Sequence, residues 1–357
     1  VSDYFAGLLN TTDHGEYFRE PGLNDAEARV LLLPDTVLPA GLSLDEAREA
    51  CRALKGSMLR QEVYADDAGP SATPEQIERA RAPYTVTEQN FTIRALQLRG
   101  ANRHAVFFTH AREAISYHYE RNPADPRIQH ALTLEVDDYG NVLKQAAIGY
   151  GRRTQIRVID AQGNVQQVPN PGLSALGASD QAKQTTALLT YTENRVTNAN
   201  ESADTYRIPP PCEALTFELT GYTATGPASG AANLVRRYQA ADFVEPDPAA
   251  SGRLRHKFID QVAYEAAATA NPCRRPIEWL RTLYRRDDLT GLLPMGELHP
   301  LALAGESYKL AFTPGLLAQV FQRPRAGLAA EPVLPDPVAV LGGPAGNQGG
   351  YLRSQTL

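Results

Sequence analysis

The sequence predicts a mainly β fold with short helices near its N-terminal end. From about residue 82 onward, apolar and polar residues alternate with a period of two, which is the pattern of strands with one buried face. A short turn motif repeats within this region, and the clearest helix-capping patterns lie before it. The 357 residues, with 26 Pro and 27 Gly, are enough for a folded, loop-rich structure that needs no disulfide or metal for its stability.

Short helices are predicted within residues 1–81, which we expect to form a segment of loops and helices. Asn24, Ser43 and Thr73 are each followed three residues later by Glu or Gln, the spacing of a capping box. After Ser43, apolar residues recur at helical spacing and predict a helix over 44–55. One face of this helix carries Leu44, Ala47, Cys51 and Leu54.

The alternating pattern predicts a β meander over residues 82–225. Its expected strands are Tyr84–Leu98, Val106–Phe108, Ile115–Tyr119, Leu132–Val136, Val142–Tyr150, Thr154–Ile159, Ala187–Val196 and Leu215–Leu219. Pro and Gly clusters then indicate a linker at 226–252, a second β region at 253–321, and a Pro/Gly-rich linker at 322–357. Residues 276–285 fit a strand and a helical stripe equally well.

The repeated turn motif is D-x-x-G-N-V, which begins at Asp137 and again at Asp160. In a tight hairpin turn, Gly adopts positive φ without strain at Cβ, Asn tolerates the left-handed region, and Val restarts the strand. A looser third copy ends near Gly291. The expected structural turn residues are therefore Asp137, Gly140, Asn141, Asp160, Gly163, Asn164 and Gly291.

Longer stretches resemble a known family. The D-x-x-G-N-V motif after an aromatic-rich strand resembles the YD/RHS repeat of large bacterial toxins. The segments 117–128, 132–153, 281–291 and 306–317 are similar to the middle and C-terminal region of the B component of insecticidal toxin complexes (Tc toxins of the TcdB/TcaC type, related to SpvB). The resemblance spans about residues 50–320 and is weakest over 160–250.

This resemblance implies a structural role in a secreted toxin complex. B and C components of this family together build a hollow cocoon of RHS-like strands around a cytotoxic effector, which an A component then translocates. The implied fold is a curved antiparallel sheet that forms part of this shell. The implied partners are the rest of the B component, the C component and, indirectly, the A-component pore, with assembly in the bacterial cytoplasm before release.

The resemblance also directs attention to enzymatic motifs, and none is found. SpvB-related ADP-ribosyltransferases use an E-x-E pair, and no two glutamates here are two residues apart. The self-cleavage signature D-P-x-G-L of C components and the D-x-D-G-x-G repeat of the propeller are also absent from the sequence. The segment is therefore expected to be shell wall, without catalytic, cofactor-binding or metal-binding residues.

Several weaker patterns have ordinary structural interpretations. His104, His110 and His118 with Glu120 suggest a metal site only if one strand runs unbroken through them, and polar strand residues are the expected alternative. The pairs Asp66-Asp67, Asp137-Asp138 and Asp287-Asp288 adjoin turn residues and are expected to be solvated. The glycine-rich run 342–350 precedes only seven residues, too few for a phosphate-binding helix, so a flexible linker is expected.

Composition narrows the remaining classes of function. The net charge of −6 argues against a nucleic-acid binder that relies on phosphate neutralisation, and the absence of a long apolar run argues against a membrane span. Cys51, Cys212 and Cys273 are expected to be free, buried thiols. Val1 and the presence of only two Met indicate a piece of a longer polypeptide. Two alternatives stay open: a secreted β module that binds a glycan or receptor, and a hydrolase dependent on His110 or His118.

Overall fold

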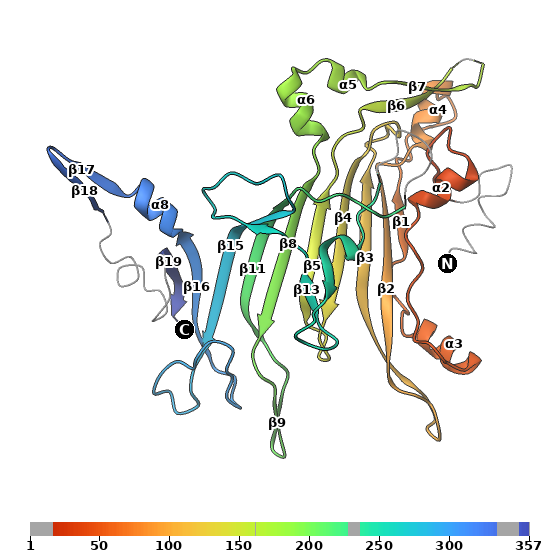
Figure 1. Ribbon diagram of the computed structural model, residues 1–357. Coiled ribbons are helices and arrows are strands. Elements are labelled where there is room, and N and C mark those ends of the chain that lie inside the picture. The colour runs from red at the N-terminus through yellow and green to blue at the C-terminus, as the bar shows by residue number, and fades with distance from the viewer. Residues whose placement is uncertain (1–16, 161, 228–235, 334–349, 357) are drawn as a thin grey trace. The chain divides into compact units, whose positions relative to one another are not determined.

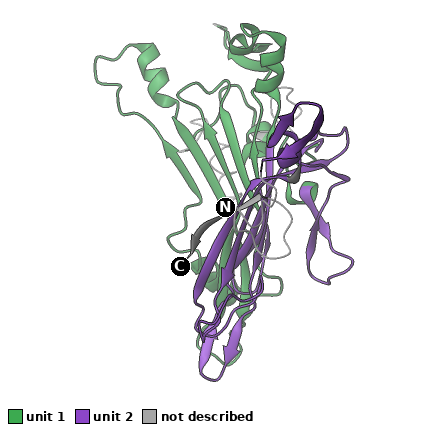
Figure 2. Cartoon of the chain, turned by 90° about the vertical axis from the view of Figure 1, so that its left-hand side faces the viewer, with its two compact units in different colours: residues 1–133, 147–188, 223–242 green, residues 134–146, 189–222, 243–357 purple. Residues whose placement is uncertain are grey.

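The computed structural model describes residues 17–160, 162–227, 236–333 and 350–356, which form a mainly β structure with short helices (Figure 1). The chain divides into two compact units (Figure 2). Unit 1 comprises residues 1–133, 147–188 and 223–242, and unit 2 comprises residues 134–146, 189–222 and 243–357. Each unit is based on antiparallel strand pairing, so the predicted fold class is confirmed.

Among the described residues, three helices near the N-terminal end begin where their capping boxes predict. They are α2 (Asp25–Leu31), α3 (Leu44–Arg52) and α4 (Pro74–Arg81). In each helix the N-cap side chain accepts a hydrogen bond from the backbone N–H three residues on, and the side chain at that position accepts one from the N-cap N–H. Such caps satisfy amides that the first helical turn leaves unpaired.

The face on which α3 packs differs from the face that its apolar residues suggest. Leu44 is 70% exposed and Cys51 is exposed, whereas Glu46 and Ala50 are buried. The reason is electrostatic, because Glu46 accepts a hydrogen bond from the backbone N–H of Arg99, at 2.9 Å. Glu49 likewise accepts from the N–H of Ala105, and both amides lie in one hairpin loop. The expected burial of Cys51 is therefore wrong.

The described strands of the sheet in unit 1 follow the order β1 (Arg60–Val63), β2 (Thr85–Gln97), β3 (Val106–His118) and β4 (Arg127–Val136), and the last three residues of β4 belong to unit 2. The two short strands expected at 106–108 and 115–119 are one strand, β3. Opposite the step from Asn90 to Phe91, one residue of β3, Arg112, is left out of the register and forms a β-bulge. One face of the sheet buries Val86, Ile115, Tyr117, Tyr119 and Ile128.

Residues 155–185 of unit 1 form a short hairpin with two helices after it. The hairpin consists of β6 (Gln155–Ile159) and β7 (Val165–Pro169), and the helices are α5 (Pro171–Ser174) and α6 (Ala178–Thr185). The sequence did not predict these helices. They are one and two turns long, and α6 begins at Gly177 without a side-chain cap, so local signals are weak.

The main strands of unit 2 follow the order β8 (Leu188–Val196), β11 (Pro211–Thr220), β15 (Cys273–Tyr284), β16 (Ala304–Phe312) and β19 (Gly350–Thr356). The strand β5 (Val142–Gly149) contributes its first residues to this unit. The ambiguous segment 276–285 therefore belongs almost wholly to a strand, β15. Tyr191 and Phe217 are fully buried on neighbouring strands of the sheet.

Smaller elements of unit 2 fill the connections between its main strands. They are β9 (Asn200–Ser202), β10 (Thr205–Arg207), β12 (Val244–Pro246), β13 (Leu254–His256), β14 (Asp260–Gln261), α8 (Pro314–Gln319), β17 (Gln322–Arg325) and β18 (Leu328–Pro332). The helix α7 (Ala240–Phe243) precedes β12. The two stretches expected as linkers, 226–252 and 322–357, thus contain regular elements, while residues 342–349 of the glycine-rich run lie outside the described residues.

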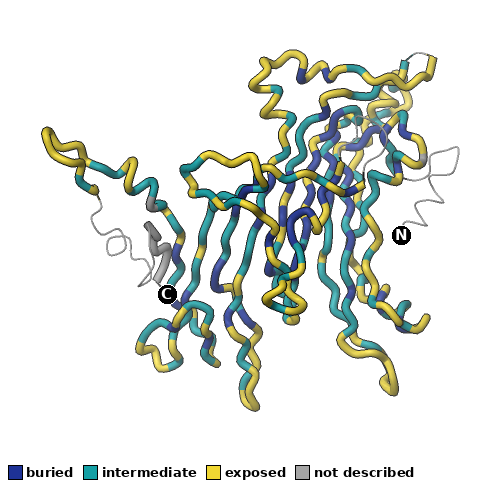
Figure 3. The backbone as a smooth tube through the Cα atoms, viewed as in Figure 1, coloured by how far each residue is buried: buried dark blue, intermediate teal, exposed yellow. Residues whose placement is uncertain are grey.

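Burial follows the strands, while hairpin tips are exposed (Figure 3). Cys212 and Cys273 are buried free thiols, as expected. Among the described residues, no helix is long and apolar enough to cross a membrane.

Candidate functional site: hairpin turns and a tied N-terminal segment

The first D-x-x-G-N turn is held by a single carboxylate. Oδ1 of Asp137 accepts hydrogen bonds from the backbone N–H of Tyr139 at 2.9 Å and of Asn141 at 2.8 Å. Oδ2 accepts one from Nδ2 of Asn141, at 2.9 Å. Gly140 has φ of +93°, a conformation that L-residues avoid. The Asp, Gly and Asn of the motif therefore each have a defined place in the turn.

The second copy of the motif has the same geometry. Oδ1 of Asp160 accepts from the backbone N–H of Gln162 and of Asn164, and Oδ2 accepts from Nδ2 of Asn164. Gly163 has φ of +84°. These hydrogen bonds, above all those from Asn164, lower the pKa of Asp160. The two turns join different pairs of strands and are built alike.

The third copy is built differently. Its ends are paired, because the N–H of Arg286 donates to the carbonyl of Gly291 at 3.0 Å. The positive φ belongs to Leu289, at +60°, and Gly291 is not among the residues with positive φ. Asp288 accepts from the backbone N–H of Thr290, at 2.9 Å. Gly291 thus lies in a turn, but not in the conformational role that Gly140 and Gly163 have.

The histidines considered as metal ligands are not brought together. His110 pairs with Thr92 of β2 and His118 pairs with Thr85, seven residues away along β2, so the two lie on opposite faces of the sheet. The bulge in β3 causes this change of face. His104 contacts Glu49 instead, at 3.0 Å. Within the described ranges, no cluster of three His, Cys, Asp or Glu side chains has the geometry of a metal site.

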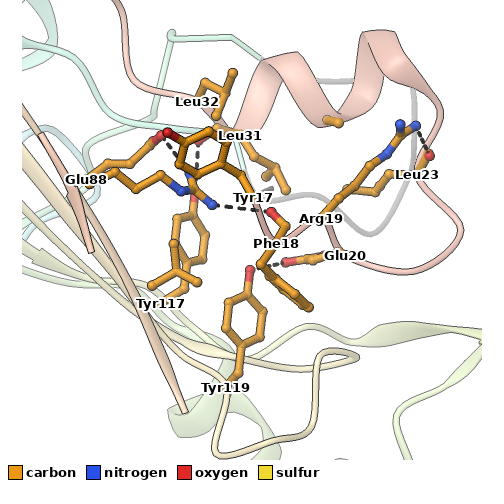
Figure 4. Close-up of a pocket in the computed structure, with 13 residues that line it drawn as sticks. Tyr17, Phe18, Arg19, Glu20, Leu23, Leu31, Leu32, Glu88, Tyr117 and Tyr119 are labelled. Atoms are coloured by element: carbon orange, nitrogen blue, oxygen red, sulfur yellow. Dashed lines mark hydrogen bonds and ion pairs between the residues drawn. The ribbon is translucent and has the colours of Figure 1, made fainter. Parts of the chain in front are cut away.

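A segment that the sequence did not single out is tied to the sheet of unit 1 by buried charges (Figure 4). We call residues 17–33 the N-terminal strap. The guanidinium of Arg153 donates two hydrogen bonds to the carboxylate of Glu20, at 2.9 and 2.8 Å, and the hydroxyl of Tyr119 donates a third, at 2.9 Å. All three residues are at most 5% exposed. Burial alone would lower the pKa of Arg153, but the charge of Glu20 outweighs it and raises that pKa.

A second charged cluster ties the strap to β1 and β2. Arg60 donates to Glu62 at 2.6 Å and to Glu88 at 2.7 Å. The two carboxylates in turn accept hydrogen bonds from strap amides, Glu62 from Phe18 and Glu88 from Leu33. Burial opposes the charge of Arg60, yet the two carboxylates raise its pKa above the ordinary value. Sheet carboxylates thus serve as acceptors for the backbone of the strap.

The cavity enclosed by the strap is too small for a substrate. Its volume is about 40 Å³, and it is lined mainly by apolar and aromatic side chains, among them Val86, Tyr117 and Leu31. A space of this size holds one or two water molecules, whereas ligand pockets are commonly several hundred Å³. The arrangement is suited to fastening one segment of the chain onto a sheet.

The sequence offered little that would have identified these residues. Glu20 and Arg153 are 133 positions apart, and each lies outside the periodic stretches. A buried salt bridge between such positions leaves no local pattern, because its charged residues look like ordinary surface residues in the sequence. Only the spatial contact distinguishes them.

Comparisons with known proteins agree with this architecture. The family described as "Insecticide toxin TcdB middle/C-terminal region" matches residues 49–208. Three crystal structures are similar over most of the chain: TcdB2-TccC3 (TM-score 0.54, 21% identity, 88% of this chain), TcdB2-TccC3 without the hypervariable C-terminal region (0.53, 22%, 88%) and TcdB2-TccC3-Cdc42 (0.51, 22%, 82%). The chain corresponds to only 13–14% of the length of those chains. A comparison with curated proteins gave no match.

The chain therefore has the fold of the matched part of those structures, a β-sheet segment built from antiparallel strands. Residues 49–208 are similar to the TcdB middle/C-terminal region of insecticidal toxins.

Proposed function

We propose that this chain is a structural segment of a Tc toxin B component and forms part of the wall of a shell that encloses a cytotoxic effector. The observation that carries this proposal is the antiparallel sheet, whose long strands β2 to β4 fall within the family match. The turn residues Asp137, Gly140, Asn141, Asp160, Gly163, Asn164 and Gly291 would shape its hairpins.

The proposed partners are those of a shell segment. They are the remainder of the B component, the C component, with which it closes the shell, and the A-component pore, which acts on the assembled shell. The similar structures contain TcdB2 together with TccC3, which supports a C-component partner. The complex would assemble in the bacterial cytoplasm and act after secretion.

The proposed role is mechanical and not catalytic. A closed sheet would keep a partly unfolded effector away from proteases and from the producing cell. The candidate histidines lie on opposite faces of a sheet, so they do not form one site. The strap cavity of about 40 Å³ is too small for a substrate, whereas a second hollow of about 740 Å³, lined by Arg112, Glu113 and Arg237 among others, is not. The position of the histidines supports a wall more than a hydrolase that depends on them.

The proposal is tested by protease protection of the effector in the assembled complex. The full-length B component would be co-expressed with its C component. In one complex the B component carries Phe217→Asp, which places a charge at a residue that is only 1% exposed. In the control complex it carries Ile277→Asp, at a residue that is 44% exposed. We expect Phe217→Asp to expose the effector to added protease and Ile277→Asp to leave it protected. Full protection in the Phe217→Asp complex would contradict a role of this segment in the wall. Glycan binding by the isolated chain would favour the alternative of a receptor-binding module.

A further inference from the structure

His256 is a buried titratable group at the end of β13, in unit 2. It is 6% exposed, and its ring stacks on that of Tyr191, with ring centroids 3.8 Å apart. Tyr191 is itself fully buried on β8. His256 thus packs the hairpin of β12 and β13, residues 244–256, against the sheet. We call these residues the 244–256 hairpin.

Both ring nitrogens of His256 have partners that suit the neutral imidazole. The hydroxyl of Tyr222 donates to the carbonyl of Lys257, so at 3.0 Å it accepts from Nε2–H of His256. Nδ1 then accepts from Nη1 of Arg274, at 3.4 Å. This tautomer is assigned from the hydrogen-bond network. A proton added to Nδ1 would make the imidazole positively charged and would face the positively charged guanidinium of Arg274, so the hydrogen bond would be lost.

Arg274 is held in this position by its other contacts. Its guanidinium carbon lies 4.5 Å from the ring centroid of Phe217 and 3.7 Å from that of Phe258. Nη1 also contacts Glu193, at 3.5 Å. Because two aromatic rings and one carboxylate fix the guanidinium, it does not easily turn away from a newly charged imidazole.

The other charged groups around the hairpin do not reverse this effect. Lys144 of β5 adds a second positive charge that acts on His256. Nearby acidic side chains already have basic partners: Glu193 with Arg274, Glu135 with Lys144 and Arg253, and Glu245 with Arg255. Other titratable groups close to the ring of His256 or to its partner Tyr222 are Tyr191, Lys257 and the buried thiol of Cys273. Burial first, and then Arg274 and Lys144, lower the pKa of His256 to about 3.

We propose that the 244–256 hairpin is an acid-released clasp, docked on the sheet while His256 is neutral and freed when His256 takes up a proton. The hairpin also contacts the sheet through an ion pair from Arg253 to Glu135, at 2.6 Å, and the half-exposed arginine makes this ion pair a weak tie. The clasp concerns this unit alone and does not depend on the proposed role in a shell.

The pH dependence of docking follows from which form of the hairpin binds the proton more readily. In the released hairpin, His256 has an ordinary pKa near 6.5 and takes up a proton as the pH falls through that value, whereas the docked form does so only near pH 3. Docking is therefore unaffected above about pH 7 and weakens below about 6.5. Between pH 7.5 and 5.0, the ratio of released to docked hairpin is expected to rise about 30-fold.

The unmodified chain gives the first test. NMR titration of the histidine side chains, with His256 assigned by the signal lost in His256→Gln, reports its pKa directly. We expect His256 to remain neutral in the docked form down to at least pH 5. Titration of His256 near 6.5 with the hairpin still protected would overturn the proposal.

Hydrogen exchange supplies the second test. The exchange rates of the amides of the hairpin and of Lys257 are measured and corrected for the intrinsic pH dependence of exchange. Protection should fall about 30-fold between pH 7.5 and 5.0, relative to the β6–β7 hairpin, which contains no histidine. His256→Phe keeps an aromatic ring on Tyr191 and should abolish this loss. His104→Gln, at a side chain 68% exposed, is the matched control and should behave as the unmodified chain. Equal acid sensitivity in His256→Phe would also overturn the proposal.

Discussion

Single residues decide the turns of this protein. Asp137 and Asp160 each accept two backbone amides and one side-chain amide within their own turn, and a glycine with positive φ follows each of them. These interactions are local in sequence, which is why the motif alone predicted them. The third copy shows the limit of the motif, since Leu289 takes the positive φ there and Gly291 does not.

At Gly163 the effect of positive φ can be measured without a change in packing. A Cβ built on Gly163 would meet no atom within 4 Å, so Gly163→Ala introduces only the strain of positive φ. We expect the β6–β7 hairpin to lose about 1 kcal/mol of local stability, measured by hydrogen exchange. Gly163→Asn should lose less, because Asn tolerates the left-handed region.

Gly69→Ala is the matched control for this substitution. Gly69 is not among the residues with positive φ, and its Cβ would also be in open space. It should leave exchange unchanged. An equal loss in both variants would show that positive φ is not the cause.

At the scale of elements, the sequence predicted the three capped helices and most of the long strands, but it missed several short elements and the face on which α3 packs. The helix α3 forms at Ser43 as its capping box predicts, yet it turns Leu44 to solvent and uses Glu46 and Glu49 to bind a hairpin loop. Apolar spacing is a poor guide in so short a helix, because two hydrogen-bonded carboxylates outweigh one leucine contact.

The attachment of the N-terminal strap gives a quantitative prediction. Replacing Glu20 with Gln leaves the buried guanidinium of Arg153 without its charge partner, and should cost about 3–5 kcal/mol in the free energy of unfolding. Chemical denaturation of the chain measures this loss. Arg153→Met should cost a similar amount, because the buried carboxylate of Glu20 then keeps only the hydrogen bond from Tyr119 and has no charge partner.

The double variant Glu20→Gln/Arg153→Met separates the pair from its surroundings. Because neither charge is then left without its partner, the double variant should lose much less free energy of unfolding than the sum of the two single losses. The exposed pair of Arg81 and Glu78, at 2.6 Å, is the control, and breaking it should cost less than about 1 kcal/mol. Strict additivity at Glu20 and Arg153 would contradict a direct interaction.

At the scale of the whole chain, each unit has an edge strand that pairs with only one described strand. In unit 1 this strand is β1, which pairs with β2, and in unit 2 it is β19, which pairs with β16. In a shell, further strands would continue these edges. Unpaired edges tend to associate with other chains.

We therefore expect the isolated 357-residue chain to self-associate as its concentration rises, measured by light scattering and thioflavin fluorescence. Val63→Lys places a charge on the exposed side of β1 and should reduce association several-fold. Val320→Lys makes the same change outside any strand and should have no effect. A stable monomer at all concentrations would contradict open edges.

What the sequence determined by itself is local: strands from their period of two, helix starts from their capping boxes, and two turns from D-x-x-G-N. The tertiary structure decided what no short window contains. It joined Glu20 to Arg153 across 133 positions, set His256 between Tyr191 and Arg274, and placed His110 and His118 on opposite faces through one bulge. The physical reason is that the periodicity of a sequence shows that one face of an element is buried but not which segment covers that face. A charged residue differs from an ordinary surface residue only when a distant segment of the chain removes it from water.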